Sequence, residues 1–69
     1  MPSMRNQFLE KVASVRRIAH EEGVHMNRNR ARSLAASWVT DCERYITWAD
    51  PTGEDAVRNV IRHQAVSAP

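Results

Sequence analysis

The 69-residue sequence is poor in residues that interrupt or cross-link a chain, with two glycines, three prolines and one cysteine. With so few breakers, the chain should form a few long elements. Because Cys42 has no second cysteine, an intramolecular disulfide is excluded and a secreted disulfide scaffold is disfavoured. The sequence also lacks the apolar run of a signal peptide and any stretch long enough to span a membrane. We therefore expect a soluble, cytoplasmic protein with no membrane contact.

Residues that carry catalysis or bind metals are equally sparse. The imidazole and thiol side chains are those of His20, His25, His63 and Cys42. Their spacings match neither a Cys-x-x-Cys nor a His-x-x-x-His pair. A helical domain of this size also offers little room for an enclosed pocket. The expectation is therefore no catalytic residue, no metal and no cofactor, with Cys42 acting as a small buried apolar side chain.

What the sequence does contain is apolar periodicity, with 42% of its residues hydrophobic. At 100° per residue, apolar side chains fall on one face in three segments. This predicts one all-α domain of three helices over residues 4–22, 27–49 and 53–65, with a tail at 66–69. The long central helix should be the spine, and the small core favours self-association, for example as a homodimer.

The helix boundaries follow from capping and breaking residues. Ser3 and Asn27 can accept hydrogen bonds from backbone N–H groups at the starts of the first two helices. Gly23 suits the left-handed residue that follows a helix. Asp50 precedes Pro51, and a residue before proline disfavours the helical region, so the central helix should end there.

Each helix should turn its apolar stripe toward a shared core. The first helix contributes Met4, Phe8, Val12, Val15 and Ala19. The central helix contributes Ala31, Leu34, Ala35, Trp38, Cys42, Tyr45 and Ala49. The last helix contributes Val57, Val60, Ile61, Gln64 and Ala65.

Charge is distributed unevenly along the chain. Residues 1–32 hold seven basic and three acidic side chains, a net of +4, whereas residues 33–69 hold three basic and five acidic, a net of −2. Arg28, Arg30 and Arg32 occupy the first turns of the central helix, where the unpaired backbone N–H groups favour acids. A phosphate or an acidic partner surface would compensate. Alternatively, Glu21 and Glu22 neutralise the cluster across the connector.

A helix-turn-helix is the obvious way to present such a cluster to DNA, but the pattern is only half matched. Ala19, Gly23 and Val24 suit the turn, whereas Asn29 and Arg32 fall where apolar residues are required. A turn two residues longer would place Ala31 and Leu34 at those positions instead. The candidate residues for binding nucleic acid or an anionic partner are Arg16, Arg17, Asn27, Arg28, Asn29, Arg30 and Arg32.

A second candidate surface lies on the outer side of the central helix, where small hydroxylated residues replace the usual charges. It is either an ordinary exposed face or an interface with a partner. Trp48, at the border of the apolar stripe, either packs in the core or anchors such an interface. The candidate interface residues are Ser33, Ser37, Thr40, Arg44 and Trp48.

Two functional hypotheses follow. The first is a small non-enzymatic regulator or inhibitor that binds a protein partner through the central helix, favoured because the net charge of +2 is low for a dedicated nucleic-acid binder. The alternative is a helix-turn-helix-like transcriptional regulator that uses the arginines at residues 28–32. The size and the lack of catalytic chemistry are typical of small regulators encoded by phages and mobile elements, although no residue motif supports that origin.

Overall fold

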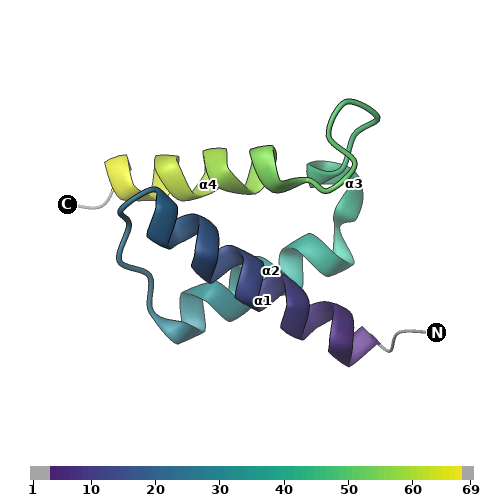
Figure 1. The fold of residues 1–69 in the computed structure, drawn as a ribbon, viewed down its shortest axis with the longest axis horizontal. Helices are drawn as coiled ribbons and strands as arrows, with labels where there is room; N and C mark the ends of the chain where they lie inside the picture. The colour runs from purple at the N-terminus through teal and green to yellow at the C-terminus, as the bar shows by residue number, and fades with distance from the viewer. Residues whose placement is uncertain (1–3, 68–69) are drawn as a thin grey trace.

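The computed structural model describes residues 4–67, and the side chains of residues 5–64 (Figure 1). Within that range the chain forms helices and no strand. The helices are α1 (Met4–Glu21), α2 (Arg28–Thr40), α3 (Cys42–Tyr45) and α4 (Glu54–Ser67). The all-α prediction is confirmed, whereas the central helix predicted over 27–49 is divided. Ser3, the predicted first cap, and the side chains of Met4 and Ala65 lie outside the described residues.

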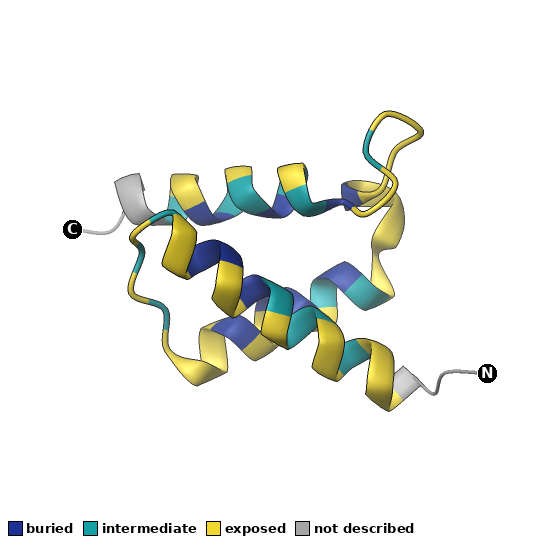
Figure 2. Ribbon diagram, in the orientation of Figure 1, coloured by how far each residue is buried: buried dark blue, intermediate teal, exposed yellow. Residues whose placement is uncertain are grey.

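The core lies where α1, α2 and α4 meet, and Trp38 is its largest fully buried side chain. Figure 2 shows the buried positions along the facing sides of these helices, as their apolar periodicity predicts. Phe8 and Val12 pack against this core from α1, half-buried. The buried core residues are Val15, Ile18, Ala19, Ala31, Leu34, Ala35, Trp38, Tyr45, Val57 and Ile61.

The connector between α1 and α2 is ordered at both ends by the predicted capping residues. Gly23 adopts φ 68°, and the backbone N–H of Val24 donates to the carbonyl of Ala19 at 2.9 Å. The bond from Val24 to Ala19 is typical of a Schellman motif at a helix end, which a left-handed glycine permits. At the other end, the Asn27 side chain accepts from the backbone N–H of Arg30 at 2.8 Å. The predicted roles of Gly23 and Asn27 are confirmed.

The central helix breaks at Asp41, whose φ of −125° and ψ of 49° are not helical. Just before it, the Thr40 hydroxyl donates to the carbonyl of Ala36 at 2.8 Å. Such back-bonding, together with the β-branched side chains of Val39 and Thr40, weakens and bends a helix. After the break the chain forms one helical turn, α3, and is then non-helical until α4 begins at Glu54.

After α3 the chain forms a loop, residues 46–53, in place of the predicted helix. Ile46 is extended, and the backbone groups of Thr47 and Asp50 exchange hydrogen bonds at 3.1 Å. The prediction that Asp50 ends the central helix is therefore wrong. Cys42 and Ala49 are exposed, so their placement in the core is also wrong. Both errors have the same cause, since the break at Asp41 changes the direction of the later residues, and of the predicted stripe residues beyond it only Tyr45 is buried.

The loop returns to pack against α2 and α3. The indole N–H of Trp38 donates to the carbonyl of Thr52 at 3.2 Å. Gly53 is buried with φ 78°, and a Cβ there would lie 3.0 Å from the Trp38 Nε1 and 3.1 Å from the Tyr45 Cβ. The hydroxyl of Tyr45 in turn hydrogen-bonds the Ser37 Oγ at 2.8 Å. Only glycine fits both the backbone angle and the space at residue 53.

The same loop caps α4. A carboxylate oxygen of Asp50 accepts from the backbone N–H of Asp55 at 3.0 Å, and the Thr52 hydroxyl accepts from that of Glu54 at 3.2 Å. Glu54 and Asp55 also place negative charge at the positive end of the helix. The helix extends to residue 67, beyond the predicted end at 65, so part of the predicted tail is helical. Residues 68–69 lie outside the described range.

Substitution of the two glycines tests this packing. Gly53→Ala should lower the free energy of unfolding by about 2–5 kcal/mol, because a left-handed alanine is strained and its methyl group overpacks the site. Gly23→Ala is the matched control: it has a similar φ but nothing within 4 Å of the added Cβ, so about 1–2 kcal/mol is expected. Urea denaturation measures both, and equal losses would contradict the packing described for Gly53.

Candidate functional site

A pocket of about 680 Å³ opens between α1 and the start of α2. Its floor is apolar and its rim carries four guanidinium groups, and we refer to it as the arginine groove. The lining residues are Arg5, Phe8, Leu9, Val12, Arg16, Arg28 and Arg32.

Helical spacing explains the α1 side of the groove. Arg5 and Arg16 are eleven residues apart, so they project within about 20° of one another around the helix. Leu9 and Val12 lie between them on the same face. Leu9 is 52% exposed, which leaves an uncovered apolar surface between two cations. Sequence reasoning missed Arg5, although this spacing with Arg16 was available to reveal it.

The first turns of α2 form the other side. Arg28 and Arg32 are one turn apart, and both are exposed. The Arg32 guanidinium lies 5.8 Å from the centre of the Phe8 ring, within the range of a cation–π contact. This contact holds one rim cation beside the apolar floor, so a ligand in the groove would meet both.

The four arginines of the groove form no ion pair with any carboxylate in the described part of the chain. Glu21 and Glu22 turn toward α4 instead. Arg58 bonds both carboxylates, at 2.9 and 2.8 Å, and Arg62 also pairs with Glu22. The hypothesis that these two glutamates neutralise the start of α2 is therefore wrong. The basic start of α2 is left without intramolecular compensation.

These ion pairs shift the titration of the acids that form them. Hydrogen bonds from Arg62 and then Arg58 lower the pKa of the Glu22 carboxyl below its usual value. A hydrogen bond from Arg58, more than that from Arg17, likewise lowers the pKa of Glu21. Charged glutamates at residues 21 and 22 therefore connect the end of α1 to α4 at neutral pH.

The remaining predicted anion-binding residues do not join the groove. Arg17 bonds Glu21 at 3.3 Å and Glu54 at 2.9 Å. Arg30 donates to the side-chain carbonyl of Gln64 on α4 at 3.2 Å. Asn29 is exposed but does not line the groove. The structure thus brings together Arg16, Arg28 and Arg32 of the predicted set and separates the others.

The helix-turn-helix comparison can also be placed on the structure. Six residues, 22–27, connect α1 to α2, compared with about three or four in the usual motif. Ala31 and Leu34 are buried, whereas Asn29 and Arg32 are exposed. The connector is two residues longer than a four-residue turn, and Ala31 and Leu34 are the residues that face the core.

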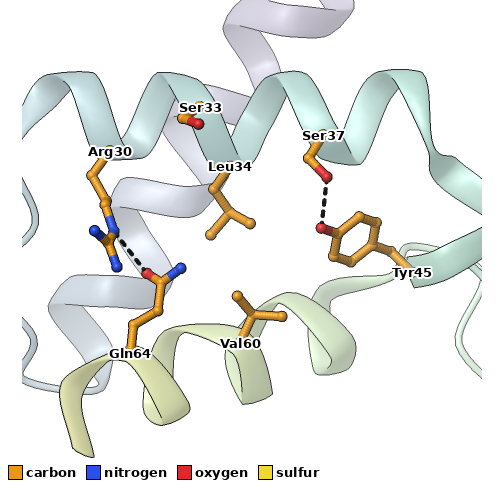
Figure 3. Close-up of a pocket in the computed structure, with 7 residues that line it drawn as sticks. All are labelled: Arg30, Ser33, Leu34, Ser37, Tyr45, Val60 and Gln64. Atoms are coloured by element: carbon orange, nitrogen blue, oxygen red, sulfur yellow. Dashed lines mark hydrogen bonds between the residues drawn. The ribbon is translucent and has the colours of Figure 1, made fainter. Parts of the chain in front are cut away.

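The predicted protein-interface residues do not form one face. Ser33 and Ser37 line a second pocket, of about 310 Å³, between α2 and α4. Figure 3 shows that its polar side chains are largely bonded to each other, Ser37 to Tyr45 and Arg30 to Gln64. Thr40 lies on the same helix at its last residue, and the break at Asp41 separates these three from Arg44 and Trp48.

Of the remaining predicted residues, Thr40 ends α2, and Arg44 and Trp48 lie beyond the break. Thr40 is bonded to its own helix, and Arg44 on α3 pairs with Asp41 at 3.3 Å. Trp48 lies in the loop and is 95% exposed. The interpretation of Trp48 as a core residue is wrong, because the helix that would have carried it into the core ends before it.

The described residues contain no group of three or more His, Cys, Asp or Glu side chains arranged to hold a metal ion. Within the same range, no helix is long and apolar enough to cross a membrane. No protein-family model, curated protein or solved structure matches the chain. The site is therefore interpreted from its own residues.

Acid should weaken the connection between α1 and α4. Because the folded pKa of Glu22 is lowered, its stabilising effect is full above the unfolded pKa and is lost as pH falls through the folded value. Thermal unfolding should show Glu22→Gln less stable than wild type at neutral pH, with the difference narrowing between about pH 5 and about pH 3. Glu10→Gln, at an exposed position without an ion pair, is the control and should track wild type. A constant difference for Glu22→Gln across this range would contradict the assignment.

Proposed function

We propose that the chain is a small non-enzymatic binding protein whose arginine groove takes a protein segment with both apolar side chains and carboxylates. The observation that carries this proposal is the exposed Leu9 surface flanked by guanidinium groups that have no acidic partner. By binding such a segment in its groove, the protein would regulate or inhibit its partner.

The two kinds of contact would contribute differently. Burial of the floor at Phe8, Leu9 and Val12 supplies affinity, at about 25 cal/mol per Å² of apolar surface removed from water. Guanidinium–carboxylate pairs at the rim supply orientation and faster association. A groove of this size buries less than a standard interface, so we expect micromolar rather than nanomolar affinity.

The binding site proposed for the protein partner is no longer the outer side of the central helix. The surface proposed from the sequence needed one continuous helix, and the break at Asp41 divides it. The arginine groove keeps the protein-partner hypothesis but moves the site to α1 and the start of α2. Residues Arg28 and Arg32 thereby serve the first hypothesis as well as the alternative.

Nucleic acid is the second candidate, and a specific observation supports it. Arg28 and Asn29 are exposed at the capped start of α2, and Arg16 lies across the groove. Phosphates could use these cations and the backbone N–H groups of the helix start. The apolar floor favours the protein segment, because contacts to a phosphate backbone make no use of Leu9.

The probe for the first test is a synthetic amphipathic helical peptide with leucines along one stripe and glutamates flanking it. Its binding, followed by fluorescence anisotropy, should weaken about tenfold in Arg32→Glu, which places a carboxylate on the rim. Arg30→Glu is the matched control, because it makes the same charge change two residues away, on a side of α2 that faces Gln64 on α4. Equal losses in the two variants would contradict the groove and indicate only a long-range charge effect.

Leu9→Ser separates the two candidate functions. The side chain is half exposed, so the substitution should barely affect folding. If the partner is a protein segment, Leu9→Ser weakens binding of the amphipathic peptide several-fold. If the natural ligand is nucleic acid, wild type and Leu9→Ser should both bind a DNA duplex equally and with a steep salt dependence, and neither should bind the peptide.

A further inference from the structure

Trp48 is the most unusual surface residue of the described chain. It is 95% exposed, and Ile46 in the same loop is 38% exposed. A large aromatic side chain in water forgoes the burial that normally stabilises it, and exposed aromatics often anchor protein interfaces. Figure 1 shows the loop projecting beyond α3, away from the packed helices.

The exposure occurs in an ordered loop. Thr47 and Asp50 exchange two backbone hydrogen bonds, and the Thr47 hydroxyl accepts a further one from the Asp50 N–H at 3.0 Å. The Thr52 hydroxyl donates to an Asp50 carboxylate oxygen at 3.0 Å. Trp48 is therefore presented to solvent by a preorganised turn, which reduces the entropy lost when a partner binds it.

The segment that carries Trp48 is acidic. Residues 41–55 hold five acidic side chains and one arginine, a net of −4. Within the described chain, three of the carboxylates that form no ion pair belong to this segment. They are those of Glu43, Asp50 and Asp55. A segment with an exposed tryptophan and carboxylates that form no ion pair has the chemistry proposed above for a ligand of the arginine groove.

We infer that the acidic segment 41–55 of one copy docks in the arginine groove of a second copy, with Trp48 over the apolar floor. This inference rests on the proposed function and names a partner for the same site. Groove and segment are complementary in charge, because four arginines without an ion pair would face three carboxylates that also lack one. The Trp48 ring would lie among guanidinium groups, which stack on its face and bond nearby carboxylates.

The contact is head to tail, so each copy uses a different surface from its neighbour. Such contacts close into a ring or continue as an open chain, according to the rotation between copies. One loop in one groove buries less than the roughly 1,600 Å² of a standard interface, so the association is micromolar or weaker. Self-association would then block the groove and compete with other acidic segments. An anionic lipid surface is a poorer partner for Trp48, because it would repel the acidic segment 41–55 that carries this residue.

The test is a mixing experiment by sedimentation velocity, using Trp48→Ala and the double variant R28E/R32E. Neither change should affect folding, because Trp48 is exposed and acids favour a helix start. Wild type should show a rising sedimentation coefficient between about 10 μM and about 1 mM at low salt, reduced at high salt. Each variant alone should stay monomeric. An equimolar mixture should associate, because one variant supplies an intact groove and the other an intact loop.

The inference is overturned if wild type stays monomeric over this range, if Trp48→Ala associates like wild type, or if the mixture stays monomeric. Arg30→Glu, which reverses one charge on α2 outside the groove, is the control and should associate like wild type. Wild type that stays monomeric but binds phosphatidylcholine vesicles through Trp48 would assign the loop to lipid instead. The proposed function is tested separately on Trp48→Ala, whose groove is intact. If neither wild type nor Trp48→Ala binds the amphipathic peptide, the proposed function is refuted, whether or not the protein self-associates.

Discussion

The close approach of Gly53 to Trp38 and Tyr45 is the constraint on which the rest of the structure depends. A backbone without a side chain reaches the Trp38 indole and the backbone and Cβ of Tyr45 only if the chain turns back soon after α2. That return requires the helix to stop near Asp41, so that one turn of α3 can bring Tyr45 toward Ser37. The stabilisation comes from burying two aromatic side chains, which outweighs the loss of helix beyond residue 45.

The same turn decides how charge is distributed. Because the turn at Gly53 places the start of α4 beside Trp38, α4 runs back toward the end of α1. Arg58 and Arg62 thereby reach Glu22. The glutamates nearest in sequence to the α2 arginines are thereby used elsewhere. Because α4 contributes no residue to the arginine groove, its acidic side chains do not pair with the arginines of the groove. A packing requirement at one end of the core thus leaves a basic, partly apolar surface at another.

Much of this architecture follows from local chemistry and was predictable. The first helix, its Gly23 ending, the Asn27 cap and the burial of Trp38 depend on neighbouring residues or on one stripe. The break at Asp41 was not predictable in the same way, because the apolar stripe continues formally through Tyr45 to Ala49. Back-bonding at Thr40 weakens the helix locally, but the return of the chain that packs Gly53 against Trp38 joins residues far apart in sequence, and helical periodicity carries no information about such contacts. The groove was half predicted for a related reason: the arginines of α2 break a local rule, whereas Arg5 shares a helix face with Arg16 but breaks no rule, and its place opposite α2 depends on how the helices pack.

Backbone NMR chemical shifts test the central claim most directly, since Cα shifts report helical conformation residue by residue. The account predicts helical shifts from Arg28 to Thr40, an interruption at Asp41, a short helical stretch to Tyr45 and non-helical values over 46–53. An uninterrupted run of helical shifts from Asn27 to Ala49 would contradict it. In that case the Gly53 packing, the exposure of Trp48 and the interpretation of the groove would all have to be abandoned.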